Sequence, residues 1–159
     1  MARPSEELEL DAERPGAVLG HMQRLGAARR GWINLQPGIR EEDAPPPPTP
    51  LGLVFSAGLH EVPVCTWVAG EVTRGGIAPD SLGVQHAAGP RAAARLSSIG
   101  HPLPEGWRLV QDHPRRGLVV RPPVGTPYEE ELIWLLAAGA SLAAVPLTGK
   151  WRALVYEGR

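Results

Sequence analysis

Residues 126–157, TPYEEELIWLLAAGASLAAVPLTGKWRALVYE, decide the fold, because they predict a capped helix followed by a strand. Thr126 supplies a hydroxyl that suits an N-cap, and Pro127 fits the first helical position, where no backbone N–H is needed. Glu129 stands three residues after the threonine and completes a capping box. The acidic residues at 129–131 also favour the positive end of a helix dipole. The helix is therefore expected to begin at Pro127.

The rest of this stretch is apolar on nearly every side of the helix. From Leu132 onward, leucine, alanine and tryptophan fill most positions, which is typical of a buried helix. Gly139 and the alanines around it allow the helix to approach a sheet closely. We expect the helix to run from Pro127 to about Ala144. Trp151–Glu157 then alternates between two faces and predicts a strand.

A hairpin is the clearest β signal upstream of this helix. Leu51–Ala57 and Val62–Val68 are rich in β-forming residues, and a loop at Gly58–Glu61 would pair them antiparallel. Both faces of this hairpin are apolar, so we expect it to lie centrally in a sheet. Pro63 is the discordant residue, because proline donates nothing to a strand ladder.

The remaining elements are shorter. Trp107–Gln111 and Leu118–Arg121 predict a second hairpin, with a turn in which Gly117 takes a positive φ. Since the strands come as adjacent hairpins, the fold class is predicted as α+β, with a mainly antiparallel sheet of five or six strands flanked by an N-terminal and a C-terminal helix. The other expected elements are a helix at Pro15–Arg29, strands at Trp32–Leu35 and Ser81–Ala87, and a short helix at Pro90–Ser97.

The chain is expected to form one domain over residues 15–159. Residues 1–14 carry five acidic side chains and little to bury, so we expect a flexible acidic N-terminus. Residues 44–50 hold five prolines and predict a semi-rigid polyproline II connector. The alternative interpretation of this proline-rich segment is a ligand for an SH3-like or WW-like partner.

Composition excludes several classes of protein. The chain has 159 residues and a net charge of −1, so it lacks the basic field of a general nucleic-acid-binding protein. All but one of its 16 basic residues are arginine, the exception being Lys150, which indicates a bacterial genome of high GC content. The single cysteine, Cys65, and the absence of an apolar leader predict a soluble cytoplasmic protein. The apolar run Leu132–Leu147 is too short for the roughly 20 residues that a bilayer requires and contains a proline, so no membrane association is expected.

Common catalytic and metal-binding motifs fail on specific residues. His60-Glu61-Val62-Pro63-Val64 lacks the second histidine of a zinc hydrolase, and the other histidines, His21, His86, His101 and His113, show no ligand spacing. Ser141 imitates a nucleophile elbow but falls inside the predicted helix. Trp151 follows Gly149-Lys150 where a phosphate loop needs Ser or Thr. We therefore predict no catalytic residues, no metal and no cofactor from motifs.

Cys65 is predicted to be a structural residue. Val64–Val68 is a strand that is apolar on both sides, and a thiol buried there has a raised pKa and is inert. A cysteine nucleophile is the alternative interpretation.

Two classes of function follow from this search. The first is a non-enzymatic binding or protein-interaction domain, acting as a homodimer or with another protein. The second is a small enzyme or small-molecule-binding protein whose site is assembled only in three dimensions. The residues to inspect for the second class are His60, Asp112, His113 and Arg115. The last three lie at a hairpin tip, which is interpreted either as an anion site, where Arg115 and Arg116 converge, or as an ordinary polar turn.

Overall fold

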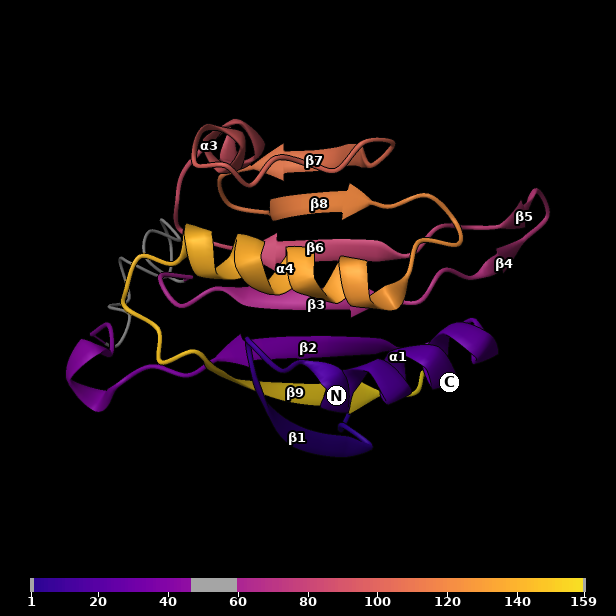
Figure 1. The fold of residues 1–159 in the computed structure, drawn as a ribbon, viewed down its shortest axis with the longest axis horizontal. Coiled ribbons are helices and arrows are strands. Elements are labelled where there is room, and N and C mark those ends of the chain that lie inside the picture. Colours follow the sequence, from indigo (N-terminus) through magenta and orange to yellow (C-terminus); the bar gives the residue numbers. More distant parts are fainter. Residues whose placement is uncertain (1, 47–59, 159) are drawn as a thin grey trace.

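The computed structural model describes residues 2–46 and 60–158, in which three α-helices lie on one face of a seven-stranded antiparallel sheet (Figure 1). The fold class predicted from the sequence is therefore confirmed. The helices are α1 (Gly16–Ala28), α3 (Ala92–Ser98) and α4 (Tyr128–Leu142), and a 3-10 turn occupies Glu41–Asp43. The sheet strands are β1 (Glu6–Asp11), β2 (Trp32–Pro37), β3 (Val64–Val68), β6 (Ser81–Gln85), β7 (Arg108–His113), β8 (Gly117–Arg121) and β9 (Lys150–Tyr156). A small separate hairpin is formed by β4 (Val72–Thr73) and β5 (Gly76–Ile77).

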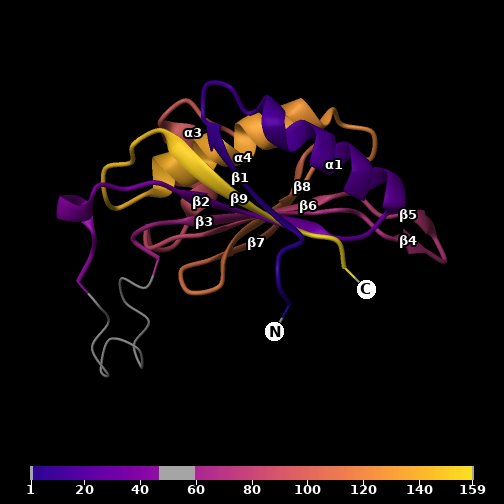
Figure 2. The same ribbon diagram turned by 90° about the horizontal axis from the view of Figure 1, so that it is seen from below.

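The strands lie in the order β1-β9-β2-β3-β6-β8-β7, and every neighbouring pair is antiparallel. The last strand of the chain, β9, lies between the first two. Figure 2 shows α1, α3 and α4 together on one side of the sheet. None of the described helices covers the opposite face, which we call the uncovered face.

The first strand was not foreseen. We expected residues 1–14 to be flexible, but Glu6–Asp11 form β1, which pairs with β9 over six residues. Leu8 and Leu10 supply the reason, because they alternate with acidic residues and pack on the core. The acidic residues Glu7, Glu9 and Asp11 stay exposed along this edge of the sheet, where charge discourages pairing with another chain.

The predicted central hairpin falls partly outside the described residues, which do not include Leu51–Ala57. Its second half is β3, and this strand is central, as expected. Over Cys65–Val68, however, β3 pairs with β2 on one edge and with β6 on the other, so its two sheet neighbours are not the preceding segment of the chain. Pro63 is buried and stands just before the strand, where a missing N–H leaves the ladder intact.

Helix α4 confirms the predicted buried helix but not its cap. Pro127 occupies the N-cap with an extended ψ of 133°, and the cap has no side-chain hydrogen bond. The hydroxyl of Thr126 instead donates to the carbonyl of Pro123 at 2.7 Å, so the expected capping box is wrong. The helix begins one residue later than predicted, and Thr126 therefore stands too early to reach its free N–H groups.

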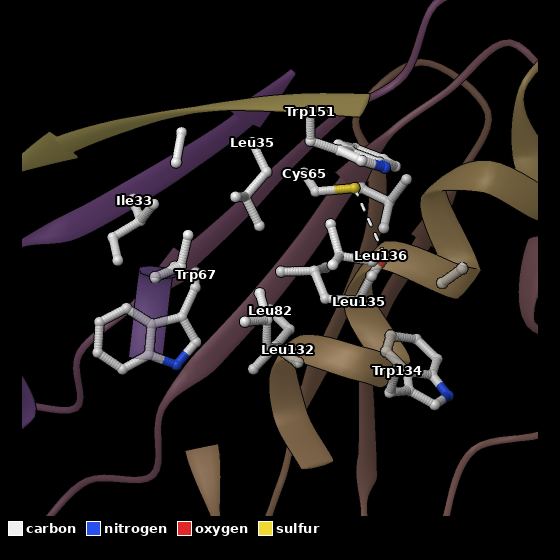
Figure 3. Close-up of a cluster of buried hydrophobic side chains, with 14 of the residues drawn as sticks. Ile33, Leu35, Cys65, Trp67, Leu82, Leu132, Trp134, Leu135, Leu136 and Trp151 are labelled. Atoms are coloured by element: carbon white, nitrogen blue, oxygen red, sulfur yellow. Dashed lines mark hydrogen bonds between the residues drawn. The ribbon is translucent and has the colours of Figure 1, made fainter. Parts of the chain in front are cut away.

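Close packing of α4 on the sheet depends on Gly139. A Cβ at this position would overlap the sulfur of Cys65 and would lie 3.1 Å from the ring of Trp151. The core beneath α4 combines strand and helix residues, and Figure 3 shows Ile33, Leu35, Cys65, Trp67 and Leu82 facing Leu132, Trp134, Leu135 and Leu136. No described helix is long and apolar enough to cross a membrane.

The proline-rich segment 44–50 is described only as far as Pro46. Ala44 has φ −61° and ψ 128°, an extended conformation close to polyproline II. The remaining prolines of the segment lie outside the described residues, so its use as a connector or as a ligand stays a prediction.

Candidate functional site

The structure does not gather Asp112, His113 and Arg115 into one site. The Asp112 carboxylate accepts the backbone N–H groups of Ala92 and Ala93, both at 3.0 Å, and so caps the start of α3. Nδ1 of His113 accepts the N–H groups of Arg115 and of the next residue, both at 3.1 Å. Successive strand residues point to opposite faces, so Asp112 and His113 also diverge. Asp112 therefore holds the start of α3, and His113 holds the backbone of its own turn.

His60 and Asp112 lie near a further histidine, His86, which is only 3% exposed. Burial lowers the pKa of its imidazole; the charge of Asp112 opposes this shift, and His60 and Arg95 add to it. The ring is therefore neutral near pH 7. Its Nδ1 accepts the N–H of Ala88 at 3.1 Å, while Nε2 has no hydrogen-bond partner in the described part of the chain. His86 does not line the hollow beside Trp32 and Tyr156 or the hollow beside Arg108 and Arg121, which are described below.

Cys65 is enclosed by the core, in agreement with a structural role. Its thiol lies 3.6 Å from the carbonyl oxygen of Leu135 (Figure 3). Burial raises the pKa of the thiol far above its ordinary value, so the reactive thiolate is not populated at neutral pH. This environment is the opposite of the electropositive, partly exposed setting of a nucleophilic cysteine.

Glu131 is the buried charged residue that the sequence analysis missed. It is 1% exposed, and its Oε2 accepts the indole N–H of Trp67 at 2.7 Å. It lies in line with Leu135 and Leu142, at the spacing of one helical stripe. That spacing was the available signal, but the three adjacent glutamates suggested a solvent-exposed first turn.

The Glu131 carboxyl is held neutral by its surroundings. Burial raises its pKa to about 8, the nearby charge of Asp80 adds to the shift, and the hydrogen bond from Trp67 opposes it. Asp80 in turn accepts the N–H of Gly70 at 2.7 Å, which ties the carboxyl pair to the backbone leading out of β3. Because Glu131 is enclosed and accepts a hydrogen bond from β3, while Asp80 holds the backbone after β3, this pair stabilises the junction between α4 and the sheet.

The uncovered face carries the side chains that the core does not use. Directly opposite residues of antiparallel strands share a face, so the strand register places one row of side chains across this end of the sheet. Val68, at the centre of the row, is 38% exposed. The members of the row are Tyr156, Trp32, Val68, Ser81, Arg121 and Arg108.

The aromatic end of this row is a stacked pair. The rings of Trp32 and Tyr156 lie 4.9 Å apart between centroids and are inclined by only 7°. They line a hollow of about 840 Å³ together with Ala2, Arg3, Ser5, Glu157 and Gly158. Trp32 is not part of the described core cluster.

The basic end of the row is a pair of arginines. Arg108 and Arg121 are directly opposite each other on β7 and β8, and both line a hollow of about 230 Å³. Neither guanidinium makes an ion pair with a described carboxylate. Nε of Arg121 is buried and has no hydrogen-bond partner among the described residues.

No protein family, curated protein or solved structure matches this chain. Function is therefore argued from the site alone.

Proposed function

We propose that the protein is a non-enzymatic binding domain whose partner, another protein chain or a second copy, docks on the uncovered face of the sheet. The observation that carries this proposal is the exposure of Val68 beside the stacked Trp32–Tyr156 pair, in the middle of the sheet. Apolar side chains grouped on a solvent-exposed face favour a contact surface, because a partner removes them from water.

The polar groups support the same function. An enzyme needs acid, base or nucleophilic groups that converge on a hollow. Asp112 and His113 are engaged by backbone N–H groups, and Cys65 and Glu131 are enclosed in the core. The hollow beside Trp32 and Tyr156 and the hollow beside Arg108 and Arg121 are lined by none of the four residues expected for an enzyme site. These observations favour a binding domain over a small enzyme.

The type of partner follows from charge and chemistry. A net charge of −1 favours a protein partner over nucleic acid. Trp32 and Tyr156 are residue types that are enriched at protein interfaces, where they contribute large rigid contacts. We keep the cytoplasm as the expected compartment, because the single thiol of Cys65 needs no oxidising environment.

The test compares two surface substitutions of matched size and exposure. Val68→Arg places a charge on the uncovered face, and Ile133→Arg places the same charge on α4, where the side chain is 51% exposed. The wild-type chain and both variants are isolated from native cells and examined by native mass spectrometry. We expect a complex heavier than the 17.0 kDa chain for the wild type and for Ile133→Arg, and its loss for Val68→Arg. A wild-type protein present only at its chain mass, or a complex that survives Val68→Arg, contradicts the proposal.

A further inference from the structure

The cross-strand pair Arg108–Arg121 places two positive charges side by side with no described partner of opposite sign. Like charges directly opposite in a sheet repel each other. Neither Asp80, which follows the hollow residue Pro79, nor Glu105, three residues before Arg108, forms an ion pair with either arginine. The arrangement therefore favours an anion from outside the described chain.

A buried donor points in the same direction. Nε of Arg121 is removed from water yet donates to no described acceptor. Buried donors of this kind are rare in folded proteins, because losing water without gaining an acceptor costs free energy. Because Nε is closed to solvent in this arrangement, it donates to an oxyanion only when the Arg121 side chain turns toward the hollow that it lines, where the planar guanidinium group matches the geometry of an oxyanion.

The hollow around the two arginines limits the size of the ligand. At about 230 Å³ it is smaller than a typical pocket for a drug-sized molecule, and it holds a single anionic group with a few further atoms. Its remaining walls are largely apolar and come from Pro79, Pro122, Pro123 and Val124, with Gly106 completing the lining. Val124 is an exposed residue, so the apolar rim faces solvent and contacts the part of the ligand that leaves the hollow.

We propose that this hollow binds a phosphate monoester, with the phosphate group held between the guanidinium groups of Arg108 and Arg121. A monoester carries a charge of about −1.5 to −2 at neutral pH, which matches two arginines better than the single charge of a carboxylate. Its oxygens accept paired hydrogen bonds from each planar guanidinium group. The proline rim then packs against the organic part of the ester.

This inference goes beyond the proposed function and needs no docked protein, although both sites lie on the uncovered face. The two can fail separately. Phosphate binding is measured on the isolated chain with arginine variants, whereas docking is measured with Val68→Arg.

The test is a calorimetric titration of the full chain at low ionic strength in a phosphate-free buffer. The probes are phenyl phosphate, inorganic phosphate and benzoate. We expect saturable binding of phenyl phosphate that is tighter than that of inorganic phosphate, and weaker binding of benzoate. Arg108→Gln and Arg121→Gln should each weaken phenyl phosphate binding about 10-fold or more, because each removes a charge-assisted donor pair.

Arg115→Gln is the matched control, since Arg115 is exposed in the turn of the same hairpin and lies outside the hollow. It should bind phenyl phosphate as the wild type does. Arg121→Lys keeps the charge but lacks Nε–H, and it should also bind more weakly. Circular dichroism verifies that each variant is folded, and Arg108→Gln provides the exposed alternative if Arg121→Gln fails to fold.

A phosphoserine peptide that binds more tightly than phenyl phosphate would identify a phosphorylated protein as the source of the ester, and the reverse would identify a small molecule.

The proposal is overturned by two results. The first is a wild-type chain that shows no saturable phosphate binding. The second is binding that is the same in the wild type, Arg108→Gln, Arg121→Gln and Arg121→Lys, since it would show a general charge effect instead of a site.

Discussion

The two faces of the sheet differ in whether their polar and aromatic side chains are enclosed in the core or lie next to solvent. On the helix-covered face, the thiol of Cys65 and the carboxyl of Glu131 are buried and make contacts to neighbouring groups. On the uncovered face, the Trp32–Tyr156 stack lines an open hollow, and Nε of Arg121 has no hydrogen-bond partner among the described residues. Cys65 and Glu131, which look reactive in the sequence, are therefore enclosed by the fold, and we propose that binding takes place on the face that none of the described helices covers.

The difference shows that residue type alone does not locate function. Cysteine and paired carboxyl groups are candidates for catalysis only where substrate can reach them. Here α4 covers Cys65 and contributes Glu131 to the buried core, and burial raises the pKa values of these two side chains. Substitutions on the covered face should therefore change the stability of the protein, and substitutions on the uncovered face should change its binding.

The largest expected effect on stability comes from the ionisation of Glu131. Its pKa is about 8 in the folded chain against an ordinary 4.5, so the unfolded state releases its proton first as the pH rises. The contribution of Glu131 to the free energy of unfolding should be largest below about pH 4.5. It should fall as the pH rises from there and should level off above about pH 8. The total change should be on the order of a few kcal/mol.

Urea unfolding at a series of pH values from about 5 to about 9 measures this dependence, because that range covers most of the interval between the two pKa values. Glu131→Gln should flatten it, because a neutral amide of the same shape replaces the acid. Glu130→Gln, at the exposed neighbouring position, should leave it unchanged. An unaltered slope in Glu131→Gln would show that other groups cause the pH dependence.

The second effect tests how closely α4 approaches the sheet. Gly139→Ala should destabilise the protein by about 1–3 kcal/mol, because the new methyl group meets the Cys65 sulfur and the Trp151 ring. Gly20→Ala in α1 is the control, since nothing lies within 4 Å of its added Cβ. It should stabilise the protein by about 0.5–1 kcal/mol through helix propensity. Thermal unfolding of both variants measures the contrast, and equal effects would mean that α4 does not pack this tightly.

Local patterns predicted much of the covered face. The nearly continuous apolar sequence of residues 132–142 identified α4 as a buried helix, and the alternation in Trp151, Ala153 and Val155 identified the buried side of β9. The strand β1 was missed because its acidic residues concealed the alternation of Leu8 and Leu10. These signals are local, and a sequence displays them directly.

The uncovered face depends on long-range register, which local patterns do not contain. Counting back from the turn, where His113 pairs with Gly117, places Arg108 opposite Pro122. A bulge between Leu109 and Gln111 shifts the pairing by one residue and brings Arg108 to Arg121 instead. The arginine pair was therefore not predictable without the structure of the hairpin.

The next prediction compares the same substitution, valine to alanine, on the two faces of the sheet. Val84→Ala removes two buried methyl groups from the covered face and should cost about 1–3 kcal/mol. Val68→Ala on the uncovered face should cost less than about 0.5 kcal/mol in the isolated chain. Chemical denaturation of both variants measures the difference. Similar losses at both positions would show that Val68 is covered in the free protein.

The smallest expected effect concerns Thr126. Its hydroxyl donates to Pro123 in an exposed turn and does not cap α4, so Thr126→Ala should change stability by less than about 0.5 kcal/mol. A true N-cap would cost about 1 kcal/mol. A loss of about 1 kcal/mol in thermal unfolding would show that Thr126 is the N-cap of α4, in contradiction to the structure.

The measurement that tests the account most directly is hydroxyl-radical footprinting of the chain in its native complex and after dilution to the free chain. Oxidation of Trp32 and Tyr156, on the uncovered face, should fall in the complex. Oxidation of Ile133 and Ile99, exposed residues of α4 and of the end of α3, should stay the same. Protection confined to the two isoleucines, with Trp32 and Tyr156 unchanged, would contradict the assignment of binding to the uncovered face.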